Sequence, residues 1–416
     1  MTEDTTPPPQ AQPALAAART AFLAGVQHHQ AGRLHEAEQC FAAAWALTPG
    51  RASVAINLAT TRLALGRPQA VLAVLAPALA ATATLTDPAD IEALLALQAR
   101  TLTVLAQPEA ALPVLDQLLQ RRPADADLHH RRGLLLGRLD HADDALAAFD
   151  TALRLDATLA PAWTQRGSLL REAGRLADAA QCFRQALAHG GDAALNRWFL
   201  ASVTGDAADA ATQAPPPYVR ALFDGYAEGF DRHLVDGLGY DVPQALAALL
   251  PAGRQFASAL DLGCGTGLCA PPLQGRVARL TGVDLSPRML AQARARGGYD
   301  ALHESELLQW LRRAQPGFDL VLAADVFIYV GELADVFGEV RRVLLPGGLF
   351  AFSVEAAADD QPAMLGPQLR YRHGLDALHA LAGSTGFDVQ AVQRRTLRHE
   401  QQQAIEGLLW VLVRQA

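Results

Sequence analysis

Two different periodicities of apolar residues divide the chain. Through about residue 192, small and apolar residues recur at helical spacing, in units of 34 residues with six extra residues around 81–87. From residue 256 onward, short continuous apolar runs alternate with helix-like segments. The first pattern predicts stacked pairs of helices, and the second predicts strands alternating with helices around a parallel sheet.

The five repeats of the first part share a small position and, sixteen residues later, a large apolar position. The small residues are Gly25, Ala59, Ala99, Gly133 and Gly167, and the large ones are Phe41, Leu75, Leu115, Phe149 and Phe183. Small residues let two helices approach closely, and the large residues fill the gap between neighbouring pairs. A generic alanine-rich bundle is the alternative, but unrelated helices do not keep a fixed register.

This pattern resembles the tetratricopeptide repeat (TPR), and the resemblance covers about residues 18–192. It implies an α-solenoid whose concave face binds a peptide or another protein. The preceding residues 1–17 are acidic and proline-rich and predict a disordered, retained tail. Residues 193–217 predict a capping helix followed by a stiff linker at Pro215–Pro217, and the domain at 218–416 follows.

The apolar runs of the second part predict the strands of a doubly wound α/β sheet. They cover residues 258–262, 277–283, 320–324 and 349–354. Two further runs, 389–397 and 408–413, predict a C-terminal antiparallel hairpin that closes one side of a mostly parallel sheet. Ligands of such sheets bind beyond the carboxyl ends of the strands.

A glycine-rich turn stands at the end of the first of these strands. Asp261 is followed by Gly263, Gly265 and Gly267, and the next strand ends in Asp284. Glycines at every second position turn a strand sharply into a helix and leave the backbone open to a ligand. A nicotinamide-binding fold is the alternative, but its fingerprint has two residues between the second and third glycine.

These motifs resemble class I S-adenosylmethionine-dependent methyltransferases over about residues 218–416. The resemblance implies S-adenosylmethionine as cofactor, with Asp261 orienting its ammonium group and Gly263, Gly265 and Gly267 bringing the backbone close. Asp284 is then expected to accept hydrogen bonds from both ribose hydroxyls. For Asp284 alone, a helix N-cap is the alternative role, which Ser286 with Pro287 can also take.

The resemblance extends to the adenine and methyl ends of the cofactor. Leu285 and Met289 are expected to pack on the adenine, and Glu306 to meet its amino group. A solvated helix acid is an equal alternative for Glu306. The strand end at Ala324 and Asp325 is expected to line the space between the sulfonium and the substrate.

Two residues have competing interpretations at the substrate side. Tyr226 lies in a segment, 218–231, that resembles the N-terminal lid of bacterial methyltransferases with the same repeats, although an aromatic residue at helical spacing favours a core position. His373, expected to open a helix near the substrate, is a candidate general base, and a surface histidine is the alternative.

Composition narrows the partners of the chain. The formal net charge of −8 over 416 residues argues against a nucleic-acid-binding surface, and no apolar stretch is long enough to span a membrane. The four cysteines form no metal-ligand array and predict reduced thiols in a cytoplasmic protein.

The sequence leaves three functions open. The first is a methyltransferase that acts on a protein or peptide held partly by the repeats. The second is a small-molecule methyltransferase that uses its repeats for assembly. The third is an interaction scaffold that binds the cofactor without catalysis.

Overall fold

The computed structural model describes residues 11–81, 87–205, 212–400 and 402–416. The chain divides into two compact units, Met1–Leu169 and Leu170–Ala416, and each is described by itself. None of the described helices is long and apolar enough to cross a membrane.

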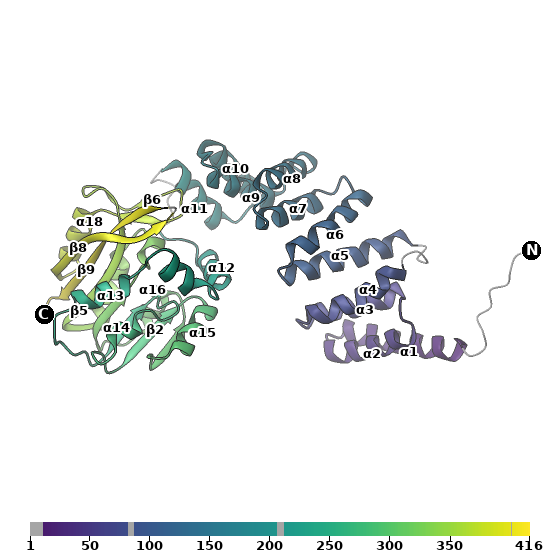
Figure 1. The fold of residues 1–416 in the computed structure, drawn as a ribbon, viewed down its shortest axis with the longest axis horizontal. Helices are drawn as coiled ribbons and strands as arrows, with labels where there is room; N and C mark the ends of the chain where they lie inside the picture. The colour runs from purple at the N-terminus through teal and green to yellow at the C-terminus, as the bar shows by residue number, and fades with distance from the viewer. Residues whose placement is uncertain (1–10, 82–86, 206–211, 401) are drawn as a thin grey trace, which may run out of the picture. The chain divides into compact units, whose positions relative to one another are not determined.

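The first unit consists of antiparallel helix pairs, which follow one another in Figure 1. The repeat helices are α1 (Ala11–Gln30), α2 (Leu34–Leu47), α3 (Ala52–Ala64), α4 (Pro68–Ala80), α5 (Pro88–Val104), α6 (Pro108–Arg121), α7 (Ala126–Arg138), α8 (Ala142–Leu155), α9 (Ala160–Glu172) and α10 (Leu176–Ala188). The predicted helix pairs are therefore present, and α10 lies in the second unit.

The small and large repeat positions contact each other as the pattern predicts. A Cβ atom on Gly25 would lie 2.6 Å from Cδ1 of Phe41, and one on Gly133 would lie 2.6 Å from Cε1 of Phe149. Both phenylalanines are buried. The rings therefore occupy the space that a larger residue on the facing helix would need.

Helix α1 begins at Ala11, inside the segment 1–17 predicted as a disordered tail. The alanine-rich stretch after Ala11 favours a helix more strongly than the preceding prolines oppose it. Residues 1–10 lie outside the described part of the chain.

The sheet of the second unit is mostly parallel. Its order is β3-β2-β1-β4-β5, with the antiparallel strand β9 on β5 and β8 on β9, while β7 pairs with the end of β5 and β6 pairs with β7. The strands are β1 (Ala259–Leu262), β2 (Leu280–Asp284), β3 (Ala301–Glu304), β4 (Phe318–Ala323), β5 (Leu344–Ala356), β6 (Met364–Leu365), β7 (Tyr371–His373), β8 (Phe387–Glu400) and β9 (Gln403–Arg414).

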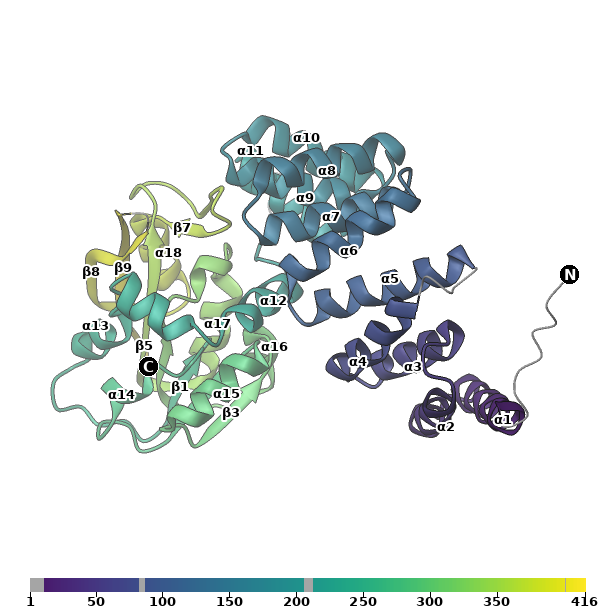
Figure 2. The same ribbon diagram turned by 45° about the vertical axis from the view of Figure 1, so that its right-hand side comes forward.

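Helices cover both faces of this sheet, as Figures 1 and 2 show. The helices that follow α10 in this unit are α11 (Ala193–Thr204), α12 (Pro216–Tyr226), α13 (Val242–Leu249), α14 (Ala270–Leu273), α15 (Pro287–Arg296), α16 (Leu307–Arg313), α17 (Ala334–Val343) and α18 (Leu375–Ser384). A π-helical turn, Arg232–Gly237, and a 3₁₀ turn, Phe327–Tyr329, complete the unit.

Alternate residues of the central strands pack into two separate hydrophobic cores, one on each face of the sheet. Phe350 and Phe352 of β5 pack with α16, α17 and α18, whereas Leu349 and Ala351 pack with α13 and α14. All four side chains are fully buried. Burial on both faces explains why these strands read as continuous apolar runs in the sequence.

The strand order reverses between β1 and β4, which are neighbours in the sheet although β2 and β3 separate them in the chain. At such a switch point the loops after the two strands diverge and leave a crevice at the carboxyl edge. The glycine turn after β1 and the Ala324–Asp325 segment after β4 both lie at this edge.

The predicted linker is part of the second unit. Ala214 N donates to Tyr329 O at 2.8 Å, and Pro215 is the N-cap of α12, so the prolines begin a helix instead of forming a spacer. Proline suits this position because the first turn needs no N–H donor. Residues 206–211 of the predicted capping segment lie outside the described residues.

The two units divide at Leu169 and Leu170, earlier than the predicted boundary at 193–217. The fully buried ring of Trp198 on α11 packs on Tyr218 of α12, with ring centroids 4.9 Å apart. Arg171 Nη1 donates to Pro367 O at 2.6 Å. The end of the repeat array is therefore built into the unit that holds the sheet.

Candidate functional site

A cavity of about 810 Å³ opens at the carboxyl edge of the sheet. It lies within the second unit and is near the upper end of the about 300–1,000 Å³ typical of small-molecule sites. Of the residues proposed from the sequence, it is lined by Gly263, Gly265, Asp284, Leu285, Met289, Glu306, Ala324, Asp325 and Tyr226. Asp261, Gly267 and His373 are not among its lining residues.

The glycine turn adopts a conformation that requires glycine. Gly263, Gly265 and Gly267 have φ angles of +63°, +54° and +88°. A Cβ on Gly263 would also lie 2.5 Å from Cγ2 of Val326. The turn therefore brings bare backbone to the cavity wall at a place where a side chain has no room.

Asp284 ends β2 next to this turn. Its Oδ2 accepts from Gly265 N and its Oδ1 from Ser286 N, both at 2.8 Å. Burial raises the pKa of the carboxyl, and these backbone donors oppose the shift. The N-cap of α15 is Ser286, whose Oγ accepts from Met289 N at 3.1 Å, so Asp284 is not needed as a helix cap.

Asp261 lies beneath the turn and is almost completely buried. Its carboxyl accepts from the Tyr299 hydroxyl, at 2.6 Å to Oδ2, and from the Cys269 thiol, while its Oδ1 has no partner by ordinary hydrogen-bond geometry within the described part of the chain. Burial raises the pKa of this carboxyl to about 7. A buried acceptor without a partner marks a place where a donor from outside the chain would be favourable.

The residues expected around the adenine lie at the beginnings of α15 and α16, the helices that follow β2 and β3. Met289 is fully buried on α15, and Leu285 is half-buried just before it. Glu306 is the N-cap of α16, and its carboxylate accepts from Leu308 N at 3.1 Å and Gln309 N at 2.7 Å. Glu306 therefore lines the cavity and also caps α16, so its position at the helix end does not exclude a contact with the adenine.

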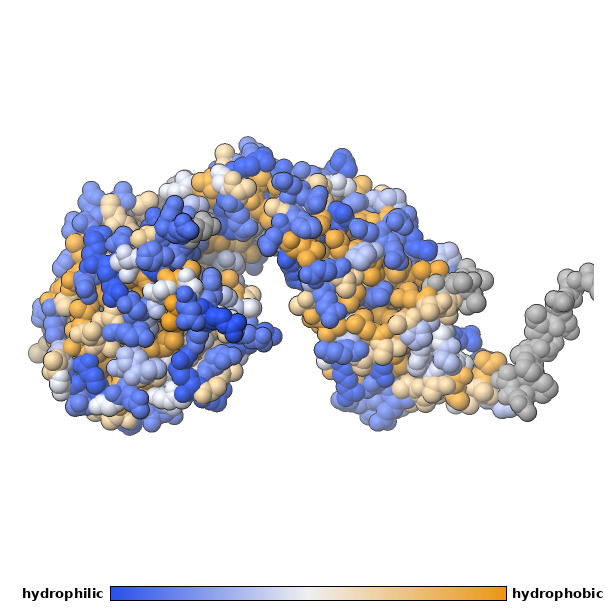
Figure 3. Space-filling view, in the orientation of Figure 1, coloured by the Kyte–Doolittle hydropathy of each residue, from blue (hydrophilic) through white to orange (hydrophobic). Residues whose placement is uncertain are grey.

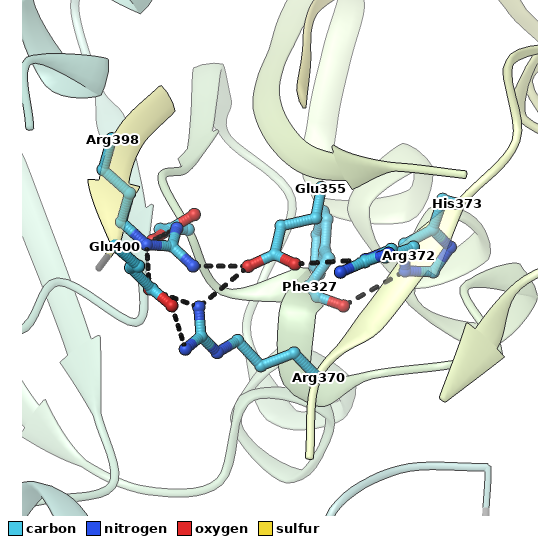
Figure 4. A network of polar contacts seen from close by, with 8 residues as sticks. Phe327, Glu355, Arg370, Arg372, His373, Arg398 and Glu400 are labelled. Carbon is cyan, nitrogen blue, oxygen red and sulfur yellow. Dashed lines mark hydrogen bonds and ion pairs between the residues drawn. The ribbon is translucent and has the colours of Figure 1, made fainter. Parts of the chain in front are cut away.

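The structure places His373 differently from both sequence interpretations. His373 ends strand β7, is 3% exposed, and its Nε2 lies 3.1 Å from Phe327 O (Figure 4). Burial lowers the pKa of the imidazole. The expected helix begins only at Leu375, so the ring packs against the backbone instead of facing the cavity.

An aromatic wall lines the cavity together with the glycine turn. Phe223, Tyr226, Phe230 and Tyr329 all line it. The ring centroids of Phe223 and Tyr329 are 5.6 Å apart and those of Tyr226 and Phe230 are 5.2 Å apart, both in edge-to-face geometry. Tyr226 is half-buried in this wall, whereas its helical spacing favoured a core position.

The cavity also contains a charged cluster that the sequence analysis did not identify. It consists of Arg370, Arg398 and Glu400, which line the cavity, and the buried Glu355, which lies between these residues and Arg372 in Figure 4. Arg398 is only 3% exposed and joins Glu355 and Glu400. The one signal in the sequence is that Glu355 follows the apolar run of β5 directly.

Comparisons with known proteins find similarity in both parts of the chain. Residues 260–352 match the family of the methyltransferase domain, and residues 160–188 match the tetratricopeptide repeat. The chain contains a methyltransferase domain. The match begins inside β1 and ends in β5, so it includes the glycine turn and Asp284.

Proteins similar to the methyltransferase domain come from bacteria and animals. Malonyl-[acyl-carrier protein] O-methyltransferase of Salmonella typhimurium is 36% identical over 137 residues, 32% of this chain and 52% of that protein. Methyltransferase-like protein 27 of Homo sapiens is 33% identical over 169 residues, 38% of this chain and 62% of that protein. The chain spans about half the length of the first curated relatives it matches.

Among solved structures, an S-adenosylmethionine dependent methyltransferase from Mesorhizobium loti is 23% identical. The match covers 41% of this chain and 96% of that one, with a TM-score of 0.32.

Proposed function

We propose that this chain transfers the methyl group of S-adenosylmethionine to an acceptor bound in the cavity of its methyltransferase domain. The observation that supports this most is the pairing of the glycine turn with Asp284, whose Oδ2 accepts from Gly265 N at 2.8 Å. The two features lie at the ends of neighbouring parallel strands and line one cavity.

The residues of the cavity fit the chemistry of this cofactor. Asp261 has a buried acceptor oxygen without a partner among the described residues, which suits an ammonium donor close by. Gly263 has no side chain to cover its backbone, and a larger residue has no room there because Val326 fills the space of a Cβ. We infer that Asp284 holds the ribose hydroxyls, with Leu285, Met289 and Glu306 around the adenine and Ala324 at the methyl end.

The bound cofactor would supply an electrophilic methyl carbon on a positively charged sulfur, which leaves as a neutral thioether. The task of the chain is then to hold the acceptor in line with that carbon, at about 3 to 3.5 Å, and to exclude water. The rings of Phe223, Tyr226, Phe230 and Tyr329 are suited to the second task because they give the cavity an apolar wall.

A general base needs a side chain that can reach the acceptor, and the buried position of His373 argues against that role. We assign His373 a positioning role instead. Its contact with Phe327 O connects β7 to the turn that follows β4, which includes the cavity residue Tyr329.

We further propose that the repeats recruit a protein, which is either the substrate or a separate partner. In Figure 3, apolar side chains gather on the visible face of the repeat unit over the region of α4 to α6. These helices carry the partly buried residues Leu72, Leu79, Ile91, Leu112 and Leu119. Apolar surface of this kind is typical of protein-binding faces of repeat arrays.

Transfer of a radiolabelled methyl group into a cell lysate tests both parts of this function. We expect label in macromolecules with the unmodified chain and none with Gly263→Ala, because the turn then no longer fits the cofactor. Label only in small metabolites would exclude a protein acceptor, and binding of the cofactor without any labelling would favour the scaffold.

A further inference from the structure

Asp325 combines three unusual features at the end of β4. Its φ angle is +61°, in the left-handed region, and its N–H donates to Ser353 Oγ at 2.8 Å. Its Oδ2 accepts from Arg398 Nη1 at 2.9 Å, whereas the buried Oδ1 has no partner within the described residues. Strained backbone and an unsatisfied buried acceptor concentrate at functional sites.

The arginines next to Asp325 are already paired with acids (Figure 4). Each nitrogen of Arg398 donates to a different carboxylate: Nη1 to Asp325, Nη2 to Glu355, and Nε to Glu400 at 2.7 Å. Arg370 donates to Glu400 through Nη1 at 2.5 Å and Nη2 at 2.8 Å. An anionic ligand would have to displace these carboxylates.

The ion pairs of the cluster join three carboxylates to three guanidiniums, of which that of Arg372 is the most exposed. Asp325, Glu355 and Glu400 contact two buried or half-buried guanidiniums, those of Arg370 and Arg398. The nearby Arg372 is half-exposed, and its Nε lies 3.8 Å from Glu355 Oε2, so water screens its charge. Over the whole cavity, the described lining residues include four carboxylates and two guanidiniums.

The carboxylates of Asp325 and Glu400 are within reach of a ligand. Both residues line the cavity, and their side chains are 14% and 26% exposed. Rotation about the Cβ–Cγ bond of Asp325 is soft, so either oxygen can meet a ligand that enters from the cavity while the other keeps the contact with Arg398. The aromatic wall adds to the preference of the cavity for a cationic ligand, because ring faces attract cations and repel anions.

We propose that the methyl acceptor enters this cavity with an ammonium group on an apolar body, and that the ammonium pairs with Asp325 and Glu400. The inference rests on the proposed methyl-transfer function and specifies the class of its substrate. The ammonium anchors the acceptor, and the methylated atom need not be the same nitrogen.

Two probes of matched shape and opposite charge test this inference. Benzylamine is cationic and phenylacetate anionic at neutral pH, and both carry the same ring. Their affinities are measured by calorimetry on the full chain saturated with S-adenosylhomocysteine. We expect benzylamine to bind at least about tenfold more tightly than phenylacetate, as the difference of one charge-assisted contact implies.

Substitutions locate the contact. Asp325→Asn keeps an acceptor for Arg398 and tolerates the left-handed backbone, and Glu400→Gln keeps the size of its side chain. Each is expected to weaken benzylamine about tenfold while S-adenosylhomocysteine still binds. Asp335→Asn on α17, in an exposed ion pair with Arg312 of α16, serves as the control and is expected to change neither affinity.

The outcomes separate this inference from the function on which it rests. Equal or tighter binding of phenylacetate, no binding of benzylamine to the loaded protein, or full benzylamine affinity in both variants would overturn the ammonium site alone. A chain that binds no S-adenosylhomocysteine would instead overturn the proposed methyl transfer.

Discussion

At the scale of single residues, Asp261 shows how a binding site is built at the expense of stability. Its carboxyl is buried, and its pKa is raised from 3.8 to about 7 because burial disfavours the charge. Between these two pH values the folded chain keeps a proton that the unfolded chain has lost. The free energy of unfolding therefore falls as the pH rises toward 7, and stays lowered above it.

Asp261→Asn removes this titration. We compare the free energy of unfolding of the variant with that of the unmodified chain. We expect the difference, variant minus unmodified, to increase by on the order of 4 kcal/mol from pH 4 to pH 8. Denaturant titrations of both proteins over that range, without cofactor, measure the difference. A difference that does not change with pH would mean that Asp261 titrates alike in the folded and unfolded chain.

Gly263 offers a second test at this scale. Gly263→Ala places a methyl group 2.5 Å from Val326 in a backbone conformation with φ +63°, so we expect a lower melting temperature and loss of cofactor binding. Gly338→Ala on α17 is the control, because no described atom lies within 4 Å of the added group. It is expected to raise stability by up to about 1 kcal/mol. Equal effects of the two substitutions would mean that the contact with Val326 and the left-handed backbone do not restrict position 263 to glycine.

The residues of the cavity differ in how far the sequence reveals them. Gly263, Gly265 and Asp284 lie in short local motifs, so their spacing alone predicts their common position. Arg398 and Glu400 on β8 meet Arg370, which directly precedes β7, only because β8 pairs with β9, β9 with β5 and β5 with β7. The sequence predicted a helix at His373, whereas the residue lies in β7. Its contact with Phe327, 46 residues earlier in the chain, produces no local sequence pattern that would indicate this position.

At the scale of helices and strands, burial decides what can be predicted. The predicted runs became β1, β2, β4 and β5 because both of their faces are covered, and 389–397 and 408–413 became β8 and β9. Strand β3 was missed because it is a short edge strand whose residues are half-buried or exposed. Such a strand has no continuous apolar run to indicate it.

The repeat helices allow a matched pair of substitutions on α7. Gly133→Ala would bring a methyl group to 2.6 Å from Phe149, whereas Gly137→Ala would meet no described atom within 4 Å. We expect Gly133→Ala to destabilise the repeat unit by about 1–3 kcal/mol through overpacking, and Gly137→Ala to leave it unchanged or more stable. Thermal unfolding followed by circular dichroism compares them, and a reversed order would refute the packing.

At the scale of the whole molecule, the division at Leu169 and Leu170 assigns α10 and α11 to the unit with the sheet. Trp198→Ala should therefore destabilise that unit, by about 3–5 kcal/mol for a fully buried aromatic residue. Trp163→Ala on α9 should act on the repeat unit instead. Calorimetric scans with and without S-adenosylmethionine distinguish the two transitions.

We expect the transition lowered by Trp198→Ala to be the one that the cofactor raises, since a ligand stabilises the unit that binds it. Trp163→Ala should lower only a transition that does not respond to the cofactor. If Trp198→Ala instead affects the unresponsive transition, the capping helix belongs with the repeats, as the sequence boundary at 193–217 implied.

Calorimetric titration of the full chain with S-adenosylmethionine measures whether the turn after β1 and Asp284 together hold this cofactor. We expect one bound molecule per chain, with Asp284→Ala weakening the affinity by about ten- to a hundredfold and the exposed control Asp335→Asn leaving it unchanged. Absence of binding, or an Asp284→Ala variant that binds as tightly as the unmodified chain, would contradict this expectation.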